Sequence, residues 1–68
     1  MINTKLLKSY FVKNGLTQEE IARKIGISYQ SLSDKVNNKV QFKIDEVANL
    51  CEILEITTEK DNIFFFKK

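Results

Sequence analysis

The chain has 68 residues, which suits a single small domain (residues 1–68), and a composition of 43% apolar residues without proline favours a folded, helical protein. With no histidine and one cysteine, the chain excludes an internal disulfide and argues against zinc coordination, nucleophile–histidine catalysis and any enzymatic role. The net charge is only +2, and the pattern contains no signal peptide or membrane span, so we expect a cytoplasmic protein with no cofactor and no membrane partner.

A first helix of about ten residues is predicted after Asn3 or Thr4, either of which can cap it. The pair Asn14 and Gly15 ends this helix. Its apolar residues recur at helical spacing, with lysines on the outer face: Leu6, Leu7, Tyr10 and Phe11 inside, and Lys5, Lys8 and Lys13 outside. We expect this helix to cover the core of the two helices that follow.

Residues 17–38 predict two short helices joined by a tight turn. The first covers residues 17–25 and begins with a capping box, in which the side chains of Thr17 and Glu20 each accept a hydrogen bond from the other's backbone amide. Gly26 fits the left-handed residue that ends a helix. Two helices on so short a turn form a helix-turn-helix, whose second helix is the candidate reader of a DNA major groove.

The second of these helices begins at the cap Ser28. Its third residue is Ser31, so its first turn has no carboxylate that would occupy the backbone amides. The small Ala22 lets the two helices approach closely. The apolar residues of both helices are expected to face one shared core: Ile21, Ile25, Ile27, Leu32 and Val36.

A loop at residues 37–39 is followed by a fourth helix. An asparagine in this loop is able to adopt a left-handed conformation, and Phe42 is expected to fill the core from the loop. The apolar stripe that predicts the fourth helix consists of Ile44, Val47, Ala48, Leu50, Cys51, Ile53 and Leu54. We interpret Cys51 as a small buried apolar residue rather than a reactive thiol.

The C-terminal end begins with Thr58, whose acidic neighbours Glu59 and Asp61 predict a fifth helix of about one or two turns. Residues 63–68 form either a tail or an edge strand that pairs with its copy across a two-fold axis. Three consecutive phenylalanines cannot all enter one small core, so at least one should be exposed. A dimer contact is therefore favoured over a hydrophobic end folded back on the domain, with these residues at the interface: Phe64, Phe65 and Phe66.

Charge is unevenly distributed along the chain. Residues 1–43 carry eight Lys/Arg and three Asp/Glu, whereas residues 45–66 carry one lysine and six acidic residues. A polyanionic partner would therefore bind the first two-thirds of the chain, around the helix-turn-helix. The alternative is that these charges only solvate the surface.

Several segments together resemble a known family. The segment Leu16–Ala22, the turn Gly26–Ser28, the segment Phe42–Val47 and the order of five helices are similar to the phage Cro and repressor DNA-binding domains, within the XRE-like helix-turn-helix regulators. The resemblance covers about residues 3–60. It implies an all-α, compact bundle of about five short helices of the lambda-repressor-like type, with the second and third helices as the helix-turn-helix.

The same resemblance implies a function. The protein would bind a double-stranded DNA operator as a homodimer, with two recognition helices in successive major grooves, and would regulate transcription by occupying the operator. No small-molecule ligand is implied. A second hypothesis, supported by the phenylalanine tail and the acidic second half, is a protein-interaction module of the same fold, such as an antirepressor or an antitoxin-like partner.

Family roles are assigned position by position. Gln30 is the best candidate for base readout, because its amide is able to donate to N7 and accept from N6 of adenine. Tyr29 either contacts DNA or packs on the loop. Residues matching base-contacting positions are Tyr29, Gln30, Ser31, Ser33 and Asp34. Residues assigned to phosphate contacts are Gln18, Ser28, Lys35, Asn37, Asn38, Lys39 and Lys43.

Two residues depart from the family pattern. Asp34 is an acid where many relatives carry a base or an amide; it could accept from cytosine N4, pair with Lys35 or Lys39, or repel wrong sequences. Lys35 occupies a position that is often apolar, with Val36 taking the core role. The sequence therefore determines the rotation of the recognition helix only to within one residue position.

Overall fold

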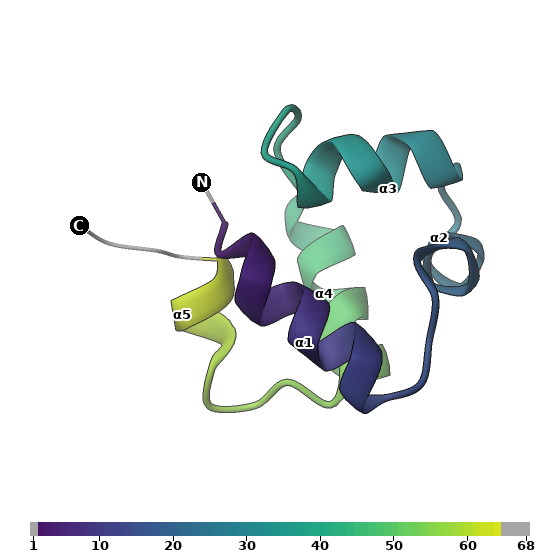
Figure 1. The fold of residues 1–68 in the computed structure, drawn as a ribbon. Coiled ribbons are helices and arrows are strands. Elements are labelled where there is room, and N and C mark those ends of the chain that lie inside the picture. Colours follow the sequence, from purple (N-terminus) through teal and green to yellow (C-terminus); the bar gives the residue numbers. More distant parts are fainter. Residues whose placement is uncertain (1, 65–68) are drawn as a thin grey trace.

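Five helices make up the part of the chain that the structure describes, residues 2–64 of a computed structural model (Figure 1). Their bounds are Thr4–Lys13 for α1, Gln18–Ile25 for α2, Tyr29–Val36 for α3, Ile44–Leu54 for α4 and Lys60–Phe64 for α5. Residues 2–64 contain no strand, so the predicted all-α bundle is confirmed. Within the predicted tail, Ile63 and Phe64 lie in α5, and residues 65–68 lie outside the described residues. None of the described helices has the length and apolar character needed to cross a membrane.

α1 begins and ends as predicted. Asn3 Oδ1 accepts a hydrogen bond from the Leu6 amide at 3.1 Å, and the Asn14 amide donates to Tyr10 O at 3.1 Å. The Asn3 amide itself donates to Ile63 O at 2.9 Å, which ties the start of α1 to α5. The Tyr10 hydroxyl donates to the Glu59 carboxylate, and this hydrogen bond, together with burial and the Glu59 charge, raises the pKa of Tyr10.

The helix-turn-helix also forms as predicted, with α2 packed against α3. Thr17 Oγ1 accepts from the Glu20 amide at 3.2 Å, and Glu20 Oε1 accepts from the Thr17 amide at 2.9 Å. Gly26 ends α2 with a φ of 80°, a left-handed conformation that glycine adopts without a Cβ clash. Ser28 caps α3 by accepting from the Ser31 amide at 3.1 Å.

One core lies between the helices. Its buried side chains are Leu7, Phe11, Ile21, Ala22, Leu32, Val36, Val47, Leu50, Leu54, Ile56, Ile63 and Phe64. Phe42 packs against this core from the loop, as predicted, with its ring edge-on to that of Phe64 at a centroid distance of 5.6 Å. Cys51 is half-buried, and burial raises the pKa of its thiol although the Lys60 charge acts in the opposite direction.

The buried face of α4 is narrower than the predicted one. Ile44 is 85% exposed and Ala48 is exposed, whereas Val47, Leu50 and Leu54 are buried. At about 100° per residue, the centre of these buried positions lies roughly 110° around the helix from that of Ile44 and Ala48. The wide apolar stripe allowed several rotations, and packing against α2 and the rest of the core selected one.

The C-terminal end of α4 carries a left-handed residue that is not glycine. Glu55 has a φ of 54°, and its amide donates to Glu52 O at 3.4 Å. Asn14 Nδ2 supplies a further hydrogen bond to the Leu54 carbonyl at 3.2 Å, so the end of α4 is held against the end of α1. A left-handed conformation costs an ordinary L-residue about 1–2 kcal/mol.

Glu55→Gly is therefore expected to stabilise the protein by about 0.5–1 kcal/mol, because relief of the left-handed conformation outweighs the added freedom of the unfolded chain. Urea denaturation measures the change. Asn38→Gly is the matched control: Asn38 also has a positive φ, 64°, but its side chain binds Ile2 and Thr4, so its replacement should destabilise. A loss of stability in Glu55→Gly would contradict the strain argument.

Candidate nucleic-acid interface

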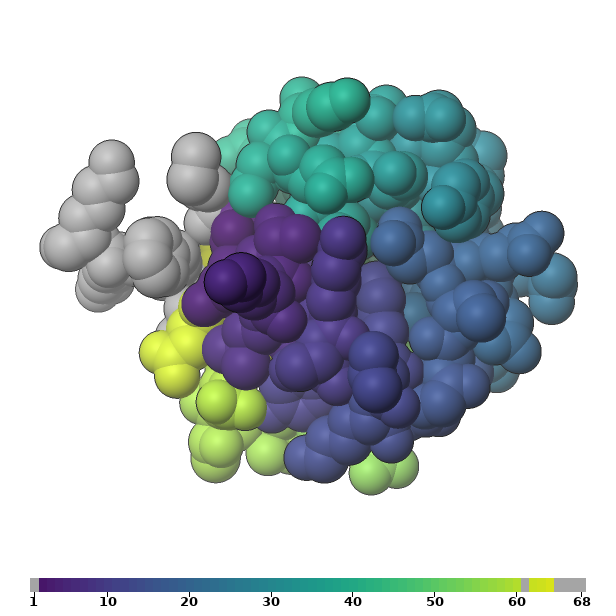
Figure 2. Space-filling view, in the orientation of Figure 1, coloured from purple at the N-terminus to yellow at the C-terminus, as the bar shows by residue number. Residues whose placement is uncertain are grey.

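α3 lies across one end of the bundle, and its outer side faces away from the other helices (Figure 1). Leu32, Lys35 and Val36 form its buried side. Tyr29, which is 53% exposed, and Gln30 lie on its exposed side. The space-filling view shows α3 and the loop after it forming one continuous surface (Figure 2). Lys35 lies on the buried side with Leu32 and Val36, and this fixes the rotation of α3.

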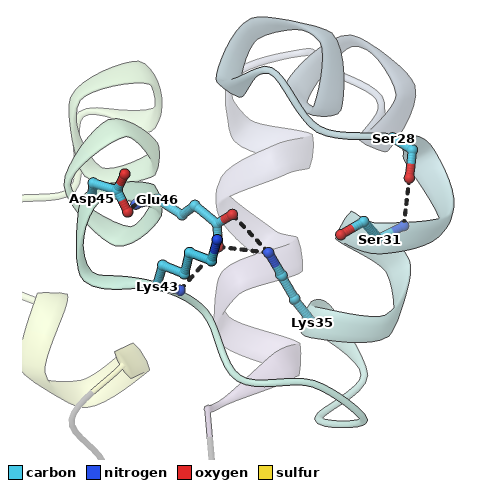
Figure 3. A network of polar contacts seen from close by, with 6 residues as sticks. All are labelled: Ser28, Ser31, Lys35, Lys43, Asp45 and Glu46. Carbon is cyan, nitrogen blue, oxygen red and sulfur yellow. Dashed lines mark hydrogen bonds and ion pairs between the residues drawn. The ribbon is translucent and has the colours of Figure 1, made fainter.

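The first turn of α3 is free of carboxylates. Ser28 Oγ accepts a hydrogen bond from the Ser31 amide, and this hydroxyl adds no negative charge to the turn (Figure 3). The N-terminus of a helix carries a partial positive charge that favours an anion such as phosphate. In α2, by contrast, Glu19 and Glu20 already supply negative charge to the first turn.

The side chain of Asp34 is hydrogen-bonded to the side chain of Gln30. Gln30 Nε2 donates to Asp34 Oδ1 at 3.0 Å, one turn along the exposed side of α3. Of the alternatives left open for Asp34, a pairing with Lys35 does not form, because the Lys35 ammonium group binds Glu46 instead. The backbone amide of Lys39 donates a hydrogen bond to the backbone carbonyl of Asp34 at 2.8 Å.

Lys35 is the clearest correction to the expected phosphate contacts. Its Nζ lies 2.8 and 2.7 Å from the two carboxylate oxygens of Glu46, and only 7% of the Lys35 side chain and 9% of the Glu46 side chain are exposed (Figure 3). The ammonium group is thus held inside the chain, linking α3 to α4, and does not face a ligand at the surface.

Glu46 has a further partner in the backbone amide of Lys43, which donates to Oε1 at 2.9 Å. Burial alone would raise the pKa of Glu46, but the hydrogen bonds from Lys35 and the Lys43 amide, with the charges of both lysines, outweigh it and lower the pKa. Glu46 is therefore ionised and paired at neutral pH.

The two asparagines after α3 have structural partners. Asn38 Oδ1 accepts from the Ile2 amide at 2.8 Å, and its Nδ2 donates to Ile2 O at 3.2 Å and to Thr4 Oγ1 at 3.3 Å. The Asn38 backbone is left-handed, as predicted for an asparagine of this loop. Asn37 is exposed, and its Nδ2 donates to Ser33 O at 2.9 Å. The side chain of Asn38 thus fastens the loop to the N-terminus.

Of the remaining predicted phosphate contacts, Lys39 and Lys43 are exposed. Gln18, in the first turn of α2, is half-buried with its Oε1 buried and unpaired within the described part of the chain. Its Nε2 is the atom that would have to donate to a phosphate.

Comparison with protein families identifies a match over nearly the whole chain. The model of the family described as "Protein of unknown function (DUF739)" matches residues 3–68. The chain belongs to the DUF739 family. No curated protein matches it.

A hollow of about 620 Å³ lies beside the α3–α4 loop of this DUF739 protein. It is lined by Ile2, Lys35, Asn38, Lys39, Val40, Gln41, Phe42, Ile44, Val47 and Phe64. Val40 and Ile44 are exposed at its edge, whereas Phe64, assigned to a dimer interface from the sequence, is only 9% exposed and packs inside its own chain. Phe65 and Phe66 lie outside the described residues, so the exposure of at least one aromatic ring at this end stays a prediction.

The role of Glu46 in this DUF739 chain is not predicted by the sequence pattern. Its position three residues after Lys43 is a weak signal for a helix-start carboxylate that binds a backbone amide. Nothing in the spacing indicates Lys35 as its partner, because the two residues lie on different helices with a loop between them. The pairing appears only when α3 and α4 pack together.

Proposed function

We propose that this protein is a sequence-specific, double-stranded DNA-binding transcriptional regulator of the phage Cro and repressor (XRE-like) type. The observation that carries the proposal is the exposed first turn of α3. Leu32, Lys35 and Val36 hold the opposite side of the helix in the core, so that Tyr29 and Gln30 face outward. An α-helix exposed in this way fits the width of a B-DNA major groove.

Electrostatics supports the same surface. The exposed Lys39 and Lys43 lie in the loop after α3, on a part of the sequence with a surplus of basic residues. Lys35 does not add to this field, since its charge is compensated by Glu46. Phosphate neutralisation by exposed lysines releases counterions, so affinity for any duplex should fall steeply as salt is raised.

The mechanism we propose is operator occupancy by a homodimer. Two copies would place their α3 helices in successive major grooves about 34 Å apart, and the bound dimer would exclude polymerase. Phe64 packs inside its own chain, so the proposed contact between copies rests on residues other than its ring. Selection of duplexes from a random pool tests the symmetry: an inverted repeat supports the dimer, and a lone half-site argues against it.

Gln30→Ala is expected to weaken binding to the selected operator by about 1–3 kcal/mol, because a bidentate base contact is lost, while leaving binding to random duplexes nearly unchanged. Fluorescence anisotropy on both duplexes, at several salt concentrations, measures this difference. Lys39→Ala is the matched control: it should weaken both duplexes about equally and reduce the salt slope by about one.

The two variants separate base readout from phosphate attraction. Equal losses on operator and random DNA for Gln30→Ala would remove Gln30 from base readout. Absence of salt-sensitive binding by the wild-type protein at low ionic strength would reject the DNA-binding proposal altogether.

A second candidate function is a protein-interaction module of the same fold. It is favoured by the exposed Ile44 and Val40 at the edge of the hollow, since a large exposed apolar side chain next to a concave surface is typical of a protein contact. The salt titration on random duplex DNA separates the two candidates. A protein-interaction module would show no salt-dependent DNA binding, and Ile44→Asp would then be expected to abolish binding to its protein partner.

A further inference from the structure

We propose that Asp34 is a positioning residue that holds the amide of Gln30 in the orientation needed to read adenine. This inference rests on the proposed function and goes beyond it, because it assigns Asp34 an action through Gln30 in place of a contact with a base of its own. It starts from the 3.0 Å hydrogen bond between Gln30 Nε2 and Asp34 Oδ1 on the exposed side of α3.

The chemistry of the pair allows one orientation only. Asp34 Oδ1 accepts this hydrogen bond, so the glutamine turns its nitrogen, and not its oxygen, toward Asp34. One Nε2–H is then used by Asp34, while the second Nε2–H and both lone pairs of Oε1 remain free. A donor and an acceptor side by side are the two groups that match N7 and N6 of adenine in the major groove.

Asp34 is itself held in place by the loop that follows α3. Its backbone carbonyl accepts from the Lys39 amide at 2.8 Å and from the Val40 amide at 3.3 Å. The loop is fastened in turn through Asn38, whose side chain binds Ile2 and Thr4. The carboxylate therefore projects from a fixed backbone, and a fixed partner reduces the rotamer freedom that Gln30 would lose on binding DNA.

The charge of Asp34 has a second, opposite effect. A carboxylate on the surface that faces DNA repels phosphates and lowers affinity for every duplex. Removing it should therefore raise binding to random DNA while reducing discrimination between bases. A merely structural role for Asp34 would instead weaken operator and random DNA alike, so the two effects together distinguish positioning from folding.

The test is a double-mutant cycle on DNA. Wild type, Asp34→Ala, Gln30→Ala and the double variant are measured on the operator selected by wild type, and on a duplex changed at the base pair where Gln30→Ala loses its preference. We expect Asp34→Ala to reduce discrimination at that pair by about three- to tenfold, a part of the roughly 5- to 150-fold that a bidentate contact provides. In the Gln30→Ala background, Asp34→Ala should have no further effect on discrimination.

Glu52→Ala is the matched control for charge, since it removes one exposed carboxylate from the last turns of α4. It should leave discrimination at the tested pair unchanged, and melting curves verify that all variants are folded. Unchanged discrimination in Asp34→Ala would overturn the inference while leaving DNA binding intact. An equal loss with and without Gln30 would also overturn it, because Asp34 would then contact the base directly. Absence of salt-sensitive DNA binding by wild type would reject the proposed function and this inference with it.

Discussion

Replacing Glu46 with alanine is expected to lower the free energy of unfolding by about 3–5 kcal/mol, because it leaves the Lys35 ammonium group buried without a partner. Small domains have total stabilities of about 5–15 kcal/mol, so this single change would bring the chain close to unfolding at room temperature. Urea denaturation at neutral pH, followed by circular dichroism, measures the loss.

Asp45→Ala is the matched control for this substitution. Asp45 is the neighbouring acid in the same first turn of α4, but its side chain is exposed and accepts from the Glu46 amide at 3.0 Å. Its loss should cost about 0.3–1 kcal/mol, the range of a helix-start carboxylate. If Glu46→Ala lost no more stability than Asp45→Ala, the buried pair would have no special role.

A paired replacement separates the effect of an orphaned charge from the worth of the ion pair. Lys35→Met combined with Glu46→Leu removes both charges and keeps apolar volume, which in buried ion pairs is often neutral or stabilising. We therefore expect the double variant to be far more stable than Glu46→Ala. Stability as low as that of the single variant would show that the pair itself, with its hydrogen bond to the Lys43 amide, is needed for packing of α3 on α4.

The lowered pKa of Glu46 also determines how this stability depends on pH. A carboxyl group with a lower pKa in the folded state binds fewer protons there than in the unfolded chain. Its contribution is fully present above the ordinary glutamate pKa and is lost as the pH falls through the lower, folded value. Glu46→Gln should remove this contribution at neutral pH and make unfolding less sensitive to acid below the ordinary glutamate pKa.

Leu50→Ala is expected to cost about 2–5 kcal/mol, whereas Ile44→Ala on the same helix should change stability by no more than about 0.5 kcal/mol. Leu50 has no exposed surface, so its truncation leaves a cavity in the core; Ile44 is 85% exposed and leaves none. Urea denaturation of the two variants side by side provides the comparison. A large loss in Ile44→Ala would mean that the buried side of α4 extends to Ile44, as the full apolar stripe predicts.

Ile44 and Leu50 also show what apolar periodicity predicts about the fold and what only tertiary packing decides. Ile44 and Leu50 are equivalent as apolar residues of one helical stripe, and periodicity places both in the core. The difference between them arises only when α4 packs, because the side of α4 that carries Leu50 and Glu46 then faces the core and Lys35, whereas Ile44 stays exposed. The spacing of apolar residues along α4 does not depend on that packing contact and therefore does not predict it.

The candidate interface likewise has one feature that the sequence predicted and one that it did not. Exposure of Gln30 on the outer side of α3 followed from the apolar positions Leu32 and Val36, which recur at helical spacing. The position of Lys35 did not follow, since a lysine is normally assigned to the surface unless a partner is known. Its partner comes from the next helix, beyond a loop whose conformation depends on the side chain of Asn38.

What the sequence determined by itself was the set of helices, their caps and the helix-turn-helix. These features depend on contacts within about four residues, such as the Thr17–Glu20 capping box, the Ser28 cap and the left-handed Gly26. The hydrogen bond between Gln30 and Asp34 is also local, because the two residues lie one turn apart on α3, although the sequence alone had suggested only Lys35 and Lys39 as protein partners of Asp34. Tertiary structure alone decided which side of α4 is buried and that Lys35 pairs with Glu46 inside the chain. Both require elements that are distant in sequence to come together.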